Sequence, residues 1–303
     1  MNIRHLRHTQ INFLKWDKCI SSAVNGTIFA YSWYLDVSSE GWEAIVADDY
    51  EMVMPLTINF KYNYLEISQP ILCPQLGVFS AIPITETIVK NFIEAIPKKF
   101  KYINIRFNKY NPFVSVDIKN QTHSLFEMDL IRPYATLASH FKSHLKQYIS
   151  EMEQQKYSVI QGVTPLQAIN YLSQTKSLGN NPDFFKMKRI ISFTISKNYG
   201  KILCLYDQQN TLCGIGYFVF SNYRVHALIM SVTEPADEIM GVTCILNNFI
   251  KNFSERHLTL VIEDSGSAKI NDIFLSLGAQ LFKYKSVQIN KPGSIWNFLG
   301  IDK

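Results

Sequence analysis

Charged residues are scarce in this chain of 303 residues. Lys, Arg, Asp and Glu together make up 18% of it, below the roughly 25% that is usual in globular proteins. Hydrophobic residues reach 47% and aromatic residues 13%, which excludes a disordered, highly charged chain. The excess of 30 basic over 25 acidic residues, a net charge of +5, is too small to indicate a dedicated nucleic-acid binder.

Long apolar segments are missing as well. The longest strand-like apolar stretch, 215–220, is far shorter than the roughly 18 residues of a membrane-spanning helix. The basic N-terminus, Met1–His8, is followed by neither an apolar region nor a small-residue cleavage site, so no signal peptide is expected. We therefore expect a cytoplasmic protein with no membrane span.

Cysteine is rare, and its five copies form no C-x-x-C pair. An odd number without paired spacing argues against a disulfide framework. Each cysteine lies among apolar or strand-like neighbours, which predicts reduced thiols in the core. The five are Cys19, Cys73, Cys204, Cys213 and Cys244.

Most standard catalytic signatures are absent, including phosphate-binding glycine loops, the zinc-protease motif and the nucleophile elbow. Gly214 and Gly216 lie inside a predicted strand, so we expect them to allow close backbone approach rather than to bind phosphate. His140 and His144 lie four residues apart on a predicted helix, but no third ligand has a suitable spacing, so no metal site is expected. The largest basic cluster, Lys186–Arg189, is interpreted as the solvated face of a helix.

The pattern of apolar residues, caps and turns predicts an α+β protein, and at roughly 100–200 residues per domain the length predicts about two domains. In the second half, three antiparallel strands precede an alternation of helix and strand. These elements are expected at 201–206, 212–220, 224–232, 236–253, 259–262, 268–277 and 281–289. Because the helix at 236–253 is a crossover connection, it predicts that strands 224–232 and 259–262 are parallel.

The first half follows a similar plan with less regular detail. Strands are expected at 42–46, 50–60, 64–68, 101–107, 113–118 and 123–130, and helices at 16–23, 31–35 and 85–96. Further helices are expected at 134–155, 165–176 and 181–196. A hinge near 131–133 then divides the chain into two domains, predicted at 1–131 and 132–303.

The strand–helix–strand segment 224–262 is where chemistry is expected. Where two parallel strands separate, a slot opens, and the helix N-terminus at its mouth offers N–H groups to a phosphate-bearing acyl donor. Ser231 or Thr233 is expected to cap this helix, and both are candidates, with Gly241, to contact the donor. Three acidic residues crowd the first turn, where they suit the helix dipole but repel a pyrophosphate. They are Glu234, Asp237 and Glu238.

Four residues near this slot are candidates for catalysis or binding. Arg224 and His226 alternate on one strand and share a face. Arg224 is a candidate to hold a carboxylate or phosphate and His226 to act as a base; alternatively, both are solvent-side edge residues. Glu263 is a candidate to deprotonate the attacking amine, or a charge near a helix N-terminus. Tyr217 is a candidate to orient or protonate the leaving group, or a buried strand tyrosine.

The loop 69–79, rich in amides, prolines and aromatics, is predicted to line a ligand cleft that faces the second domain. Gln69 and Gln75 are its candidate substrate-binding residues, and the alternative is a rigid structural loop. Tyr31 and Trp33 are predicted to line the same cleft from one helix face, or to belong to an aromatic core.

Several segments, in their order along nearly the whole chain, carry a resemblance to a known family. They are 25–36, 51–56, 69–70, 75–79, 128–130, 143–156, 217–231 and 274–279. In this arrangement the chain resembles the GNAT-fold N-acyltransferases. It is more closely similar to tandem-GNAT proteins akin to the Fem peptidoglycan aminoacyltransferases, in the single-chain form common in Bacteroidetes-type bacteria. The resemblance implies two GNAT-like domains in tandem, each a mixed central sheet flanked by helices.

The resemblance also implies an activity, the transfer of an acyl or aminoacyl group from an activated donor to an amine. Acyl-CoA is then a donor substrate rather than a permanently bound cofactor, and the acceptor is a small-molecule or peptidoglycan-precursor-like amine. Transfer RNA is the one nucleic acid implied, as the carrier of an aminoacyl donor, although it fits poorly with the modest charge. We expect a monomer or a weak dimer.

Departures from the family pattern keep a second interpretation open. In acetyl-CoA users the helix after the fourth strand begins with an Arg/Gln-x-x-Gly-x-Gly/Ala pattern, whereas Glu238–Thr243 keeps one Gly and reverses the charge. In related tandem proteins the fourth strand ends in Asp-Phe-Glu-Gly-Ser, whereas 263–267 here reads Glu-Asp-Ser-Gly-Ser. The chain is therefore either an N-acyltransferase acting at the cleft between its domains or a catalytically inactive tandem-GNAT scaffold that binds a small molecule or peptide.

Overall fold

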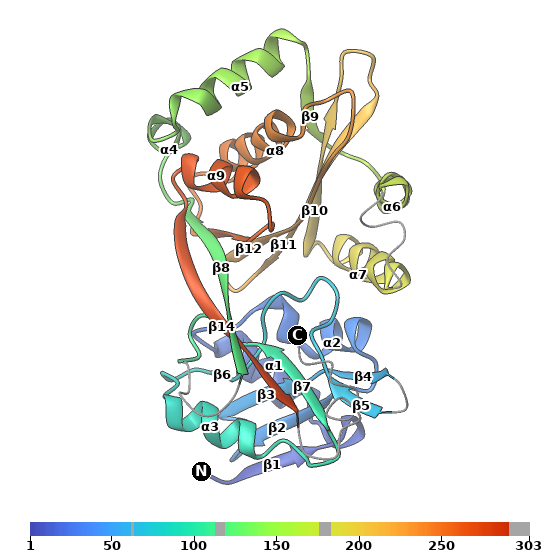
Figure 1. Ribbon diagram of the computed structural model, residues 1–303, viewed down its shortest axis with the longest axis vertical. Coiled ribbons are helices and arrows are strands. Elements are labelled where there is room, and N and C mark those ends of the chain that lie inside the picture. The colour runs from blue at the N-terminus through green and yellow to red at the C-terminus, as the bar shows by residue number, and fades with distance from the viewer. Residues whose placement is uncertain (62–63, 113–118, 176–182, 291–303) are drawn as a thin grey trace. The chain divides into compact units, whose positions relative to one another are not determined.

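The computed structural model describes residues 1–61, 64–112, 119–175 and 183–290 (Figure 1). The structure is α+β, as predicted, and it divides into two compact units. Unit 1 contains Met1–His123 and the chain from Lys283 onward, and unit 2 contains Ser124–Phe282. The units differ from the ranges 1–131 and 132–303 because strands β8 (Lys119–Asp129) and β14 (Gln280–Asn290) each run through a division. The strand predicted at 113–118 lies outside the described residues.

Unit 1 contains strands in the orders β1-β2-β3-β6 and β4-β5-β7-β14. Its other strands are β1 (Ile3–Leu6), β2 (Glu43–Ala47), β3 (Met52–Leu56), β4 (Ile58–Lys61), β5 (Tyr64–Ile67), β6 (Phe79–Ser80) and β7 (Tyr102–Arg106). Its α-helices are α1 (Phe13–Ser22), α2 (Ser32–Ser38) and α3 (Glu86–Glu94). The strand expected at 42–46 is β2, which pairs antiparallel with β3, with Glu43 opposite Leu56. The single strand expected at 50–60 is instead two strands, β3 and β4, in separate sheets.

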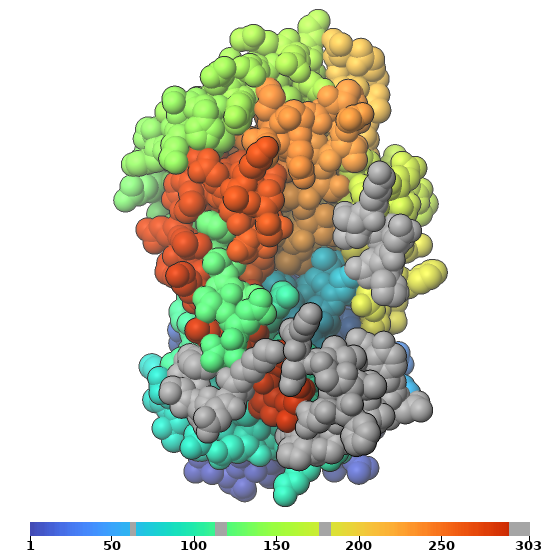
Figure 2. Space-filling view, in the orientation of Figure 1, coloured from blue at the N-terminus to red at the C-terminus, as the bar shows by residue number. Residues whose placement is uncertain are grey.

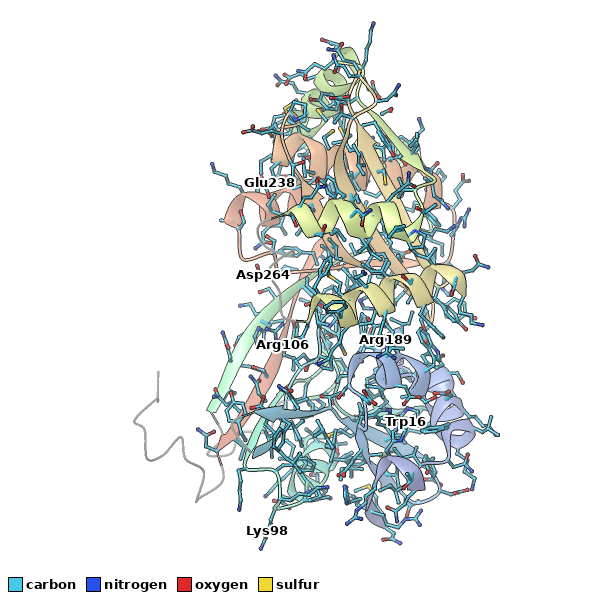
Figure 3. All side chains as sticks on the ribbon, turned by 90° about the vertical axis from the view of Figure 1, so that its right-hand side faces the viewer. Trp16, Lys98, Arg106, Arg189, Glu238 and Asp264 are labelled. Atoms are coloured by element: carbon cyan, nitrogen blue, oxygen red, sulfur yellow. The ribbon has the colours of Figure 1, made fainter. Side chains whose placement is uncertain are left out.

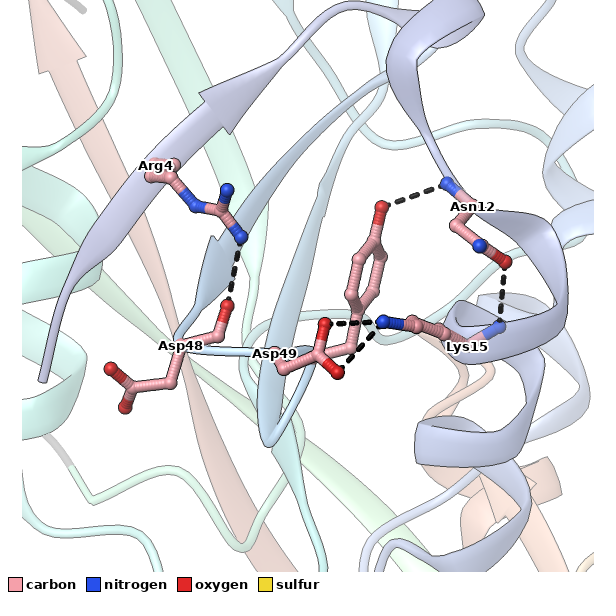
Figure 4. Close-up of polar contacts among 6 residues, drawn as sticks. Arg4, Asn12, Lys15, Asp48 and Asp49 are labelled. Atoms are coloured by element: carbon pink, nitrogen blue, oxygen red, sulfur yellow. Dashed lines mark hydrogen bonds and ion pairs between the residues drawn. The ribbon is translucent and has the colours of Figure 1, made fainter.

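Hydrogen bonds and an ion pair join the turn between β2 and β3 to β1 and to the start of α1 (Figure 4). Asp48 and Tyr50 adopt φ angles of 49° and 66°, in the left-handed region that is unfavourable for residues with a side chain. The Arg4 guanidinium donates to the Asp48 carbonyl over 2.9 Å, and the Lys15 ammonium lies 2.6 Å from Asp49 Oδ1. The Tyr50 hydroxyl accepts from the backbone N–H at the start of α1 over 2.7 Å. These contacts offset the unfavourable backbone and fix the position of α1.

Three buried asparagines hold the loop that follows β5. Asn111 donates from Nδ2 to the Val78 carbonyl over 2.9 Å, and its Oδ1 accepts from the Val78 N–H over 2.7 Å. Asn25 donates to the same carbonyl over 2.8 Å, and Asn108 donates to a neighbouring carbonyl of the loop over 3.0 Å. Gly77 has a φ of +108°, and a Cβ there would collide with Asn111 Oδ1. The loop therefore requires glycine at this position and amide side chains around it.

An Asn111→Asp variant tests this asparagine network. The carboxylate keeps the shape of the amide but loses its two donated bonds, to Val78 and Asn108, and it places a charge at a site that is 8% exposed. We expect the free energy of unfolding to fall by about 2–4 kcal/mol, measured by urea denaturation. Asn170→Asp, at an exposed position of unit 2, is the control, with an expected change below about 0.5 kcal/mol. Equal losses in the two variants would contradict the structural role of Asn111.

Unit 2 is built on strands in the order β8-β13-β12-β11-β10-β9. Besides β8, these are β9 (Ser158–Gln161), β10 (Gly200–Tyr206), β11 (Leu212–Ser221), β12 (Arg224–Val232) and β13 (Thr259–Glu263). Its helices are α4 (Tyr134–Ser139), α5 (Ser143–Gln154), α6 (Pro165–Gln174), α7 (Phe184–Ser196), α8 (Glu238–Phe253) and α9 (Ala268–Ser276). The predicted parallel pairing of β12 with β13 is confirmed.

Helices cover both faces of this sheet, with α6 and α7 on one face and α5, α8 and α9 on the other (Figure 1). On the α8 side, the Phe218 and Phe249 rings stack with centroids 4.0 Å apart. A Cβ at Gly216 would lie 2.5 Å from Ile245 Cγ2, and one at Gly241 would lie 2.8 Å from a Val232 methyl. The expectation that Gly216 allows close backbone approach is confirmed: α8 rests directly on β11 and β12.

The prediction of a single helix at 134–155 is wrong. The chain forms two helices there, α4 and α5, because the Lys142 N–H donates to the Ser276 carbonyl at the end of α9 over 3.0 Å. That bond replaces the helical one and turns the chain. His140 and His144 therefore belong to different elements and do not share one helix face.

The cysteines and apolar segments are placed as their surroundings indicate. All five cysteines are buried and free, and burial raises the pKa of Cys19 to about 11. Over the described ranges, no helix combines the length and apolar character needed to cross a membrane.

Candidate functional site

The parallel pairing between β12 and β13 stops part-way along β12. Among the described residues, it joins Arg224–Ala227 to Thr259–Ile262, and from there to Val232 β12 is paired with β11 but not with β13. On the other side of β12, β11 pairs its consecutive residues 217 and 218 with Ile229 and Ala227. Leu228 is therefore an extra, bulged residue that disturbs the ladder. The bulge lies where the parallel pairing ends, so it marks the start of the slot that the sequence predicts.

A pocket of about 640 Å³ lies at the helix ends that follow these two strands. The first turn of α8 follows β12, the first turn of α9 follows β13, and α5 supplies a third side of the pocket. Figure 2 shows these three helices on one face of unit 2. The lining residues are His144, Tyr148, Asp237, Ile239, Met240, Ala268, Lys269, Asp272 and Ile273.

The opposite face of the sheet carries a row of charged residues. By register, Arg224 lies in line with Asp129, with Thr259 between them, because paired residues point to the same side of a sheet. His226 is likewise in line with Glu127. Glu263 follows the last pair and belongs to this face by alternation along β13.

Sequence reasoning missed Glu127 and Asp129. Both alternate with buried Phe126, Met128 and Leu130, a pattern that marks a strand with one polar face. The pairing of β8 with β13 joins segments that lie far apart in the chain. Only that pairing brings the two carboxylates to the face that carries Arg224 and His226.

No protein-family model and no curated protein matches the sequence. Solved structures do match it. A FemX crystal structure is 9% identical with a TM-score of 0.66 and covers 99% of this chain and 100% of its own. A tandem GNAT protein from the clavulanic acid biosynthesis pathway is 10% identical with a TM-score of 0.56 and covers 97% and 100%. The C-terminal domain of a lysylphosphatidylglycerol synthetase from Agrobacterium fabrum is 7% identical with a TM-score of 0.55 and covers 95% of this chain and 94% of its own.

This chain has a tandem GNAT/Fem-like fold. The tandem GNAT fold accounts for the repeated plan of the sequence, in which each half places a helix between strands. At these identities the likeness shows the fold alone, so the roles of individual residues depend on the geometry of this chain.

The three candidate donor-binding residues of this GNAT-like unit have structural contacts. The N-cap of α8 is Asp237, whose carboxylate accepts from the Met240 N–H over 3.0 Å, so the expected cap at Ser231 or Thr233 is wrong. The reason is that residues 233–237 separate the end of β12 from the first residue of α8, so Ser231 and Thr233 lie too far from the helix to cap it. The Tyr171 hydroxyl donates toward the Ser231 carbonyl over 3.5 Å and lies 3.2 Å from Thr233 Oγ1. Gly241 lies against β12, and donor contact by these three residues stays a prediction.

His226 is the most strongly perturbed of the candidate side chains. It is 4% exposed, and burial, with a smaller contribution from the Arg224 charge, lowers its pKa to about 3. The ring is therefore neutral at pH 7 and is a weak proton acceptor there. A general base works best with a pKa near the operating pH, so this environment does not favour the predicted role of His226.

Tyr217 and Glu263 have opposite surroundings. Tyr217 is fully buried, its hydroxyl lies 2.6 Å from Thr194 Oγ1, and burial raises its pKa. A hydroxyl enclosed in this way matches the alternative of a buried strand tyrosine. Glu263 is partly exposed at the end of β13, one position beyond Ile262, where the parallel pairing stops. It is the candidate that lies next to the predicted slot.

The four candidates of unit 1 lie on α2 and the loop that contacts it, since the Tyr34 hydroxyl donates to the carbonyl of Leu72 over 2.6 Å. Gln69 uses both ends of its amide, donating to the Cys73 carbonyl and accepting from a backbone N–H of β7 over 3.1 Å. Gln75 is buried. The rings of Tyr31 and Trp33, both half-buried, stack with centroids 6.5 Å apart. The cleft between the domains that these four residues were expected to line stays a prediction.

The pKa of His226 predicts how the stability of unit 2 depends on pH. The unfolded histidine titrates near 6.5 and the folded one near 3, so between these values the unfolded state binds more protons. The stability contribution is full above about pH 6.5 and is lost as the pH falls toward 3. Between pH 7 and 5 we expect a loss of about 2 kcal/mol in the free energy of unfolding, measured by urea denaturation at each pH.

A His226→Gln variant should lack this part of the pH dependence, whatever its stability at pH 7. His257→Gln, at an exposed position of the same unit, should keep it. If the His226→Gln and unmodified chains lose the same free energy between pH 7 and 5, burial of His226 is not the cause.

Proposed function

We propose that unit 2 transfers an acyl or aminoacyl group from an activated donor to an amine, at the slot between β12 and β13. The observation that carries the proposal is the coincidence of the bulge at Leu228 with the end of the parallel pairing at Ala227 and Ile262. Separated strands leave room for a thin acyl arm. A bulged residue also frees backbone polar groups that a regular ladder would use.

The reaction needs an oxyanion donor and a proton acceptor more than it needs a nucleophilic side chain. The amine attacks the donor carbonyl carbon, a C–N bond forms, and the carbonyl oxygen gains negative charge. The peptide N–H of Leu228 is our candidate to donate to that oxygen. Glu263 takes the proton released by the amine and passes it to the departing thiol or hydroxyl as the bond to the donor carrier breaks.

The acceptor enters from the charged face of the sheet in this proposal. On that face the three carboxylates of Glu127, Asp129 and Glu263 outnumber the guanidinium of Arg224, which favours an ammonium group. The resemblance to the Fem enzymes supports a small-molecule or peptidoglycan-precursor-like amine as the acceptor. The likeness to the lysylphosphatidylglycerol synthetase domain supports an aminoacyl group as the transferred unit.

The negative charge at the start of α8 affects which donor can bind. Asp237 occupies the helix N-terminus with its own carboxylate, and Glu238 follows in the first turn. A pyrophosphate would meet negative charge at the place where helix N–H groups usually bind it. This favours a donor other than acyl-CoA, and it is also the observation that supports the second candidate, a binding scaffold without transfer activity.

An Asp237→Asn variant measures this repulsion. Asparagine still caps a helix but carries no charge, so we expect the Kd for CoA to fall about tenfold, since removing a close like charge is worth on the order of 1 kcal/mol near a surface. Titration of CoA with the melting temperature as readout gives the Kd. Glu153→Gln on α5 removes a charge outside the pocket and is the control. An unchanged Kd in Asp237→Asn would show that the acidic cap does not decide donor choice.

A Glu263→Gln variant tests the transfer itself. The donor is first found by thermal shift against acetyl-CoA, longer acyl-CoAs and deacylated tRNA, since a ligand at a hundred times its Kd adds about 2.7 kcal/mol. With that donor and a lysine-containing peptide, we expect kcat to fall about 10²–10⁴-fold while the melting temperature stays unchanged. Glu153→Gln should keep full kcat. Transfer by neither the unmodified chain nor the variants, despite donor binding, would favour the scaffold.

A further inference from the structure

We propose that unit 2 docks onto an anionic phospholipid bilayer through α7. The α7 surface is defined here as Phe185, Lys186, Lys188 and Arg189. The proposal is independent of the acyl transfer proposed above, because it concerns the helical layer that lies across the sheet from the donor pocket.

The segment of the sequence that contains α7 carries much of the positive charge of the chain. From Lys156 to Lys201 the sequence has seven basic residues and one acidic residue, Asp183. The net charge of +6 for this segment exceeds the +5 of the whole chain. α7 carries three basic and no acidic residues, whereas α5, α8 and α9 together carry three basic and four acidic ones. Among these four helices, α7 is therefore the one whose charge attracts anions.

α7 turns these charges away from its own sheet. Its buried residues are Met187, Ile190, Ile191 and Thr194. Phe185 and Arg189 lie one turn apart on the exposed side, and Phe185 is 77% exposed. In Figure 3, which views unit 2 from the side of α6 and α7, Arg189 is labelled on α7. The Lys188 ammonium lies 5.8 Å from the centroid of the Phe185 ring, so the exposed ring is bordered by cations.

This combination complements the surface of an anionic bilayer. A large apolar side chain enters the boundary between headgroups and acyl chains, while Lys and Arg meet the lipid phosphates. The three basic residues of α7 lie within four consecutive positions, whereas the binding of a nucleic acid depends on a longer basic stripe. Phe185 offers no hydrogen-bond donor to a phosphate or sugar. The charge and the exposed ring together favour lipid over RNA.

Co-sedimentation of the full chain with vesicles tests the proposal. We expect binding to vesicles that contain phosphatidylglycerol, little binding to phosphatidylcholine alone, and weaker binding as salt is raised. The double variant Lys186→Gln, Arg189→Gln should lower the partition coefficient about 30-fold, because each cation near an anionic surface contributes about 1 kcal/mol. Phe185→Ser should lower it about tenfold.

A second double variant separates position from net charge. Lys146→Gln, Lys251→Gln removes the same charge from exposed positions of α5 and α8, and it should bind within about twofold of the unmodified chain. Equal losses in the two double variants would overturn the proposal. So would failure to bind anionic vesicles, including the case in which the α7 variants lose binding to single-stranded RNA instead. Melting temperatures check that every variant is folded.

Discussion

Close packing of α8 on its sheet is the contact on which the rest of unit 2 depends. At Gly216 and Gly241 the backbone of the helix and the strands approach so closely that a methyl group on either glycine would collide with a neighbour. This contact holds α8 over β11 and the C-terminal half of β12, where Leu228 is bulged. It thereby fixes where the first turns of α8 and α9 meet. The position of the pocket and of the acidic start of α8 follows from it.

Local chemistry made much of this fold predictable. Thr85 and Thr164 cap α3 and α6 as their positions before apolar runs indicate, and the crossover at 236–253 has few arrangements other than a parallel strand pair. The break between α4 and α5 is different, because it depends on a bond from Lys142 to the carbonyl of Ser276, far along the chain. No local pattern near residue 140 contains that information. The cap of α8 was missed for a related reason: several residues of capping type precede the helix, and the end of β12 decides among them.

The candidate site was predictable in outline and less so in its members. Residue type singled out Tyr217 and His226, but their burial could not be seen before the sheet was assembled, and burial removes much of their acid–base capacity. Glu127 and Asp129 were missed because β8 and β13, which pair with each other, are separated in the sequence by more than half the length of unit 2. Glu263 was placed well because its position depends only on where one short strand ends. Gln69 shows the opposite case, in which a side chain typical of binding loops is occupied by hydrogen bonds to the backbone of Cys73 and Arg106.

The path of β14 has a consequence for how the protein is made. Most of this strand follows unit 2 in the chain, yet it pairs with β7 of unit 1, and Gln288 bonds to Tyr102 across 186 residues of sequence. During synthesis from the N-terminus, the edge of β7 therefore emerges long before its partner does. Unit 2 has to be produced, and its two ends brought together, before that edge is covered. Such long-range pairing slows folding and leaves a strand edge exposed to association in the meantime. The nascent chain thus passes through a stage in which its first unit lacks a strand.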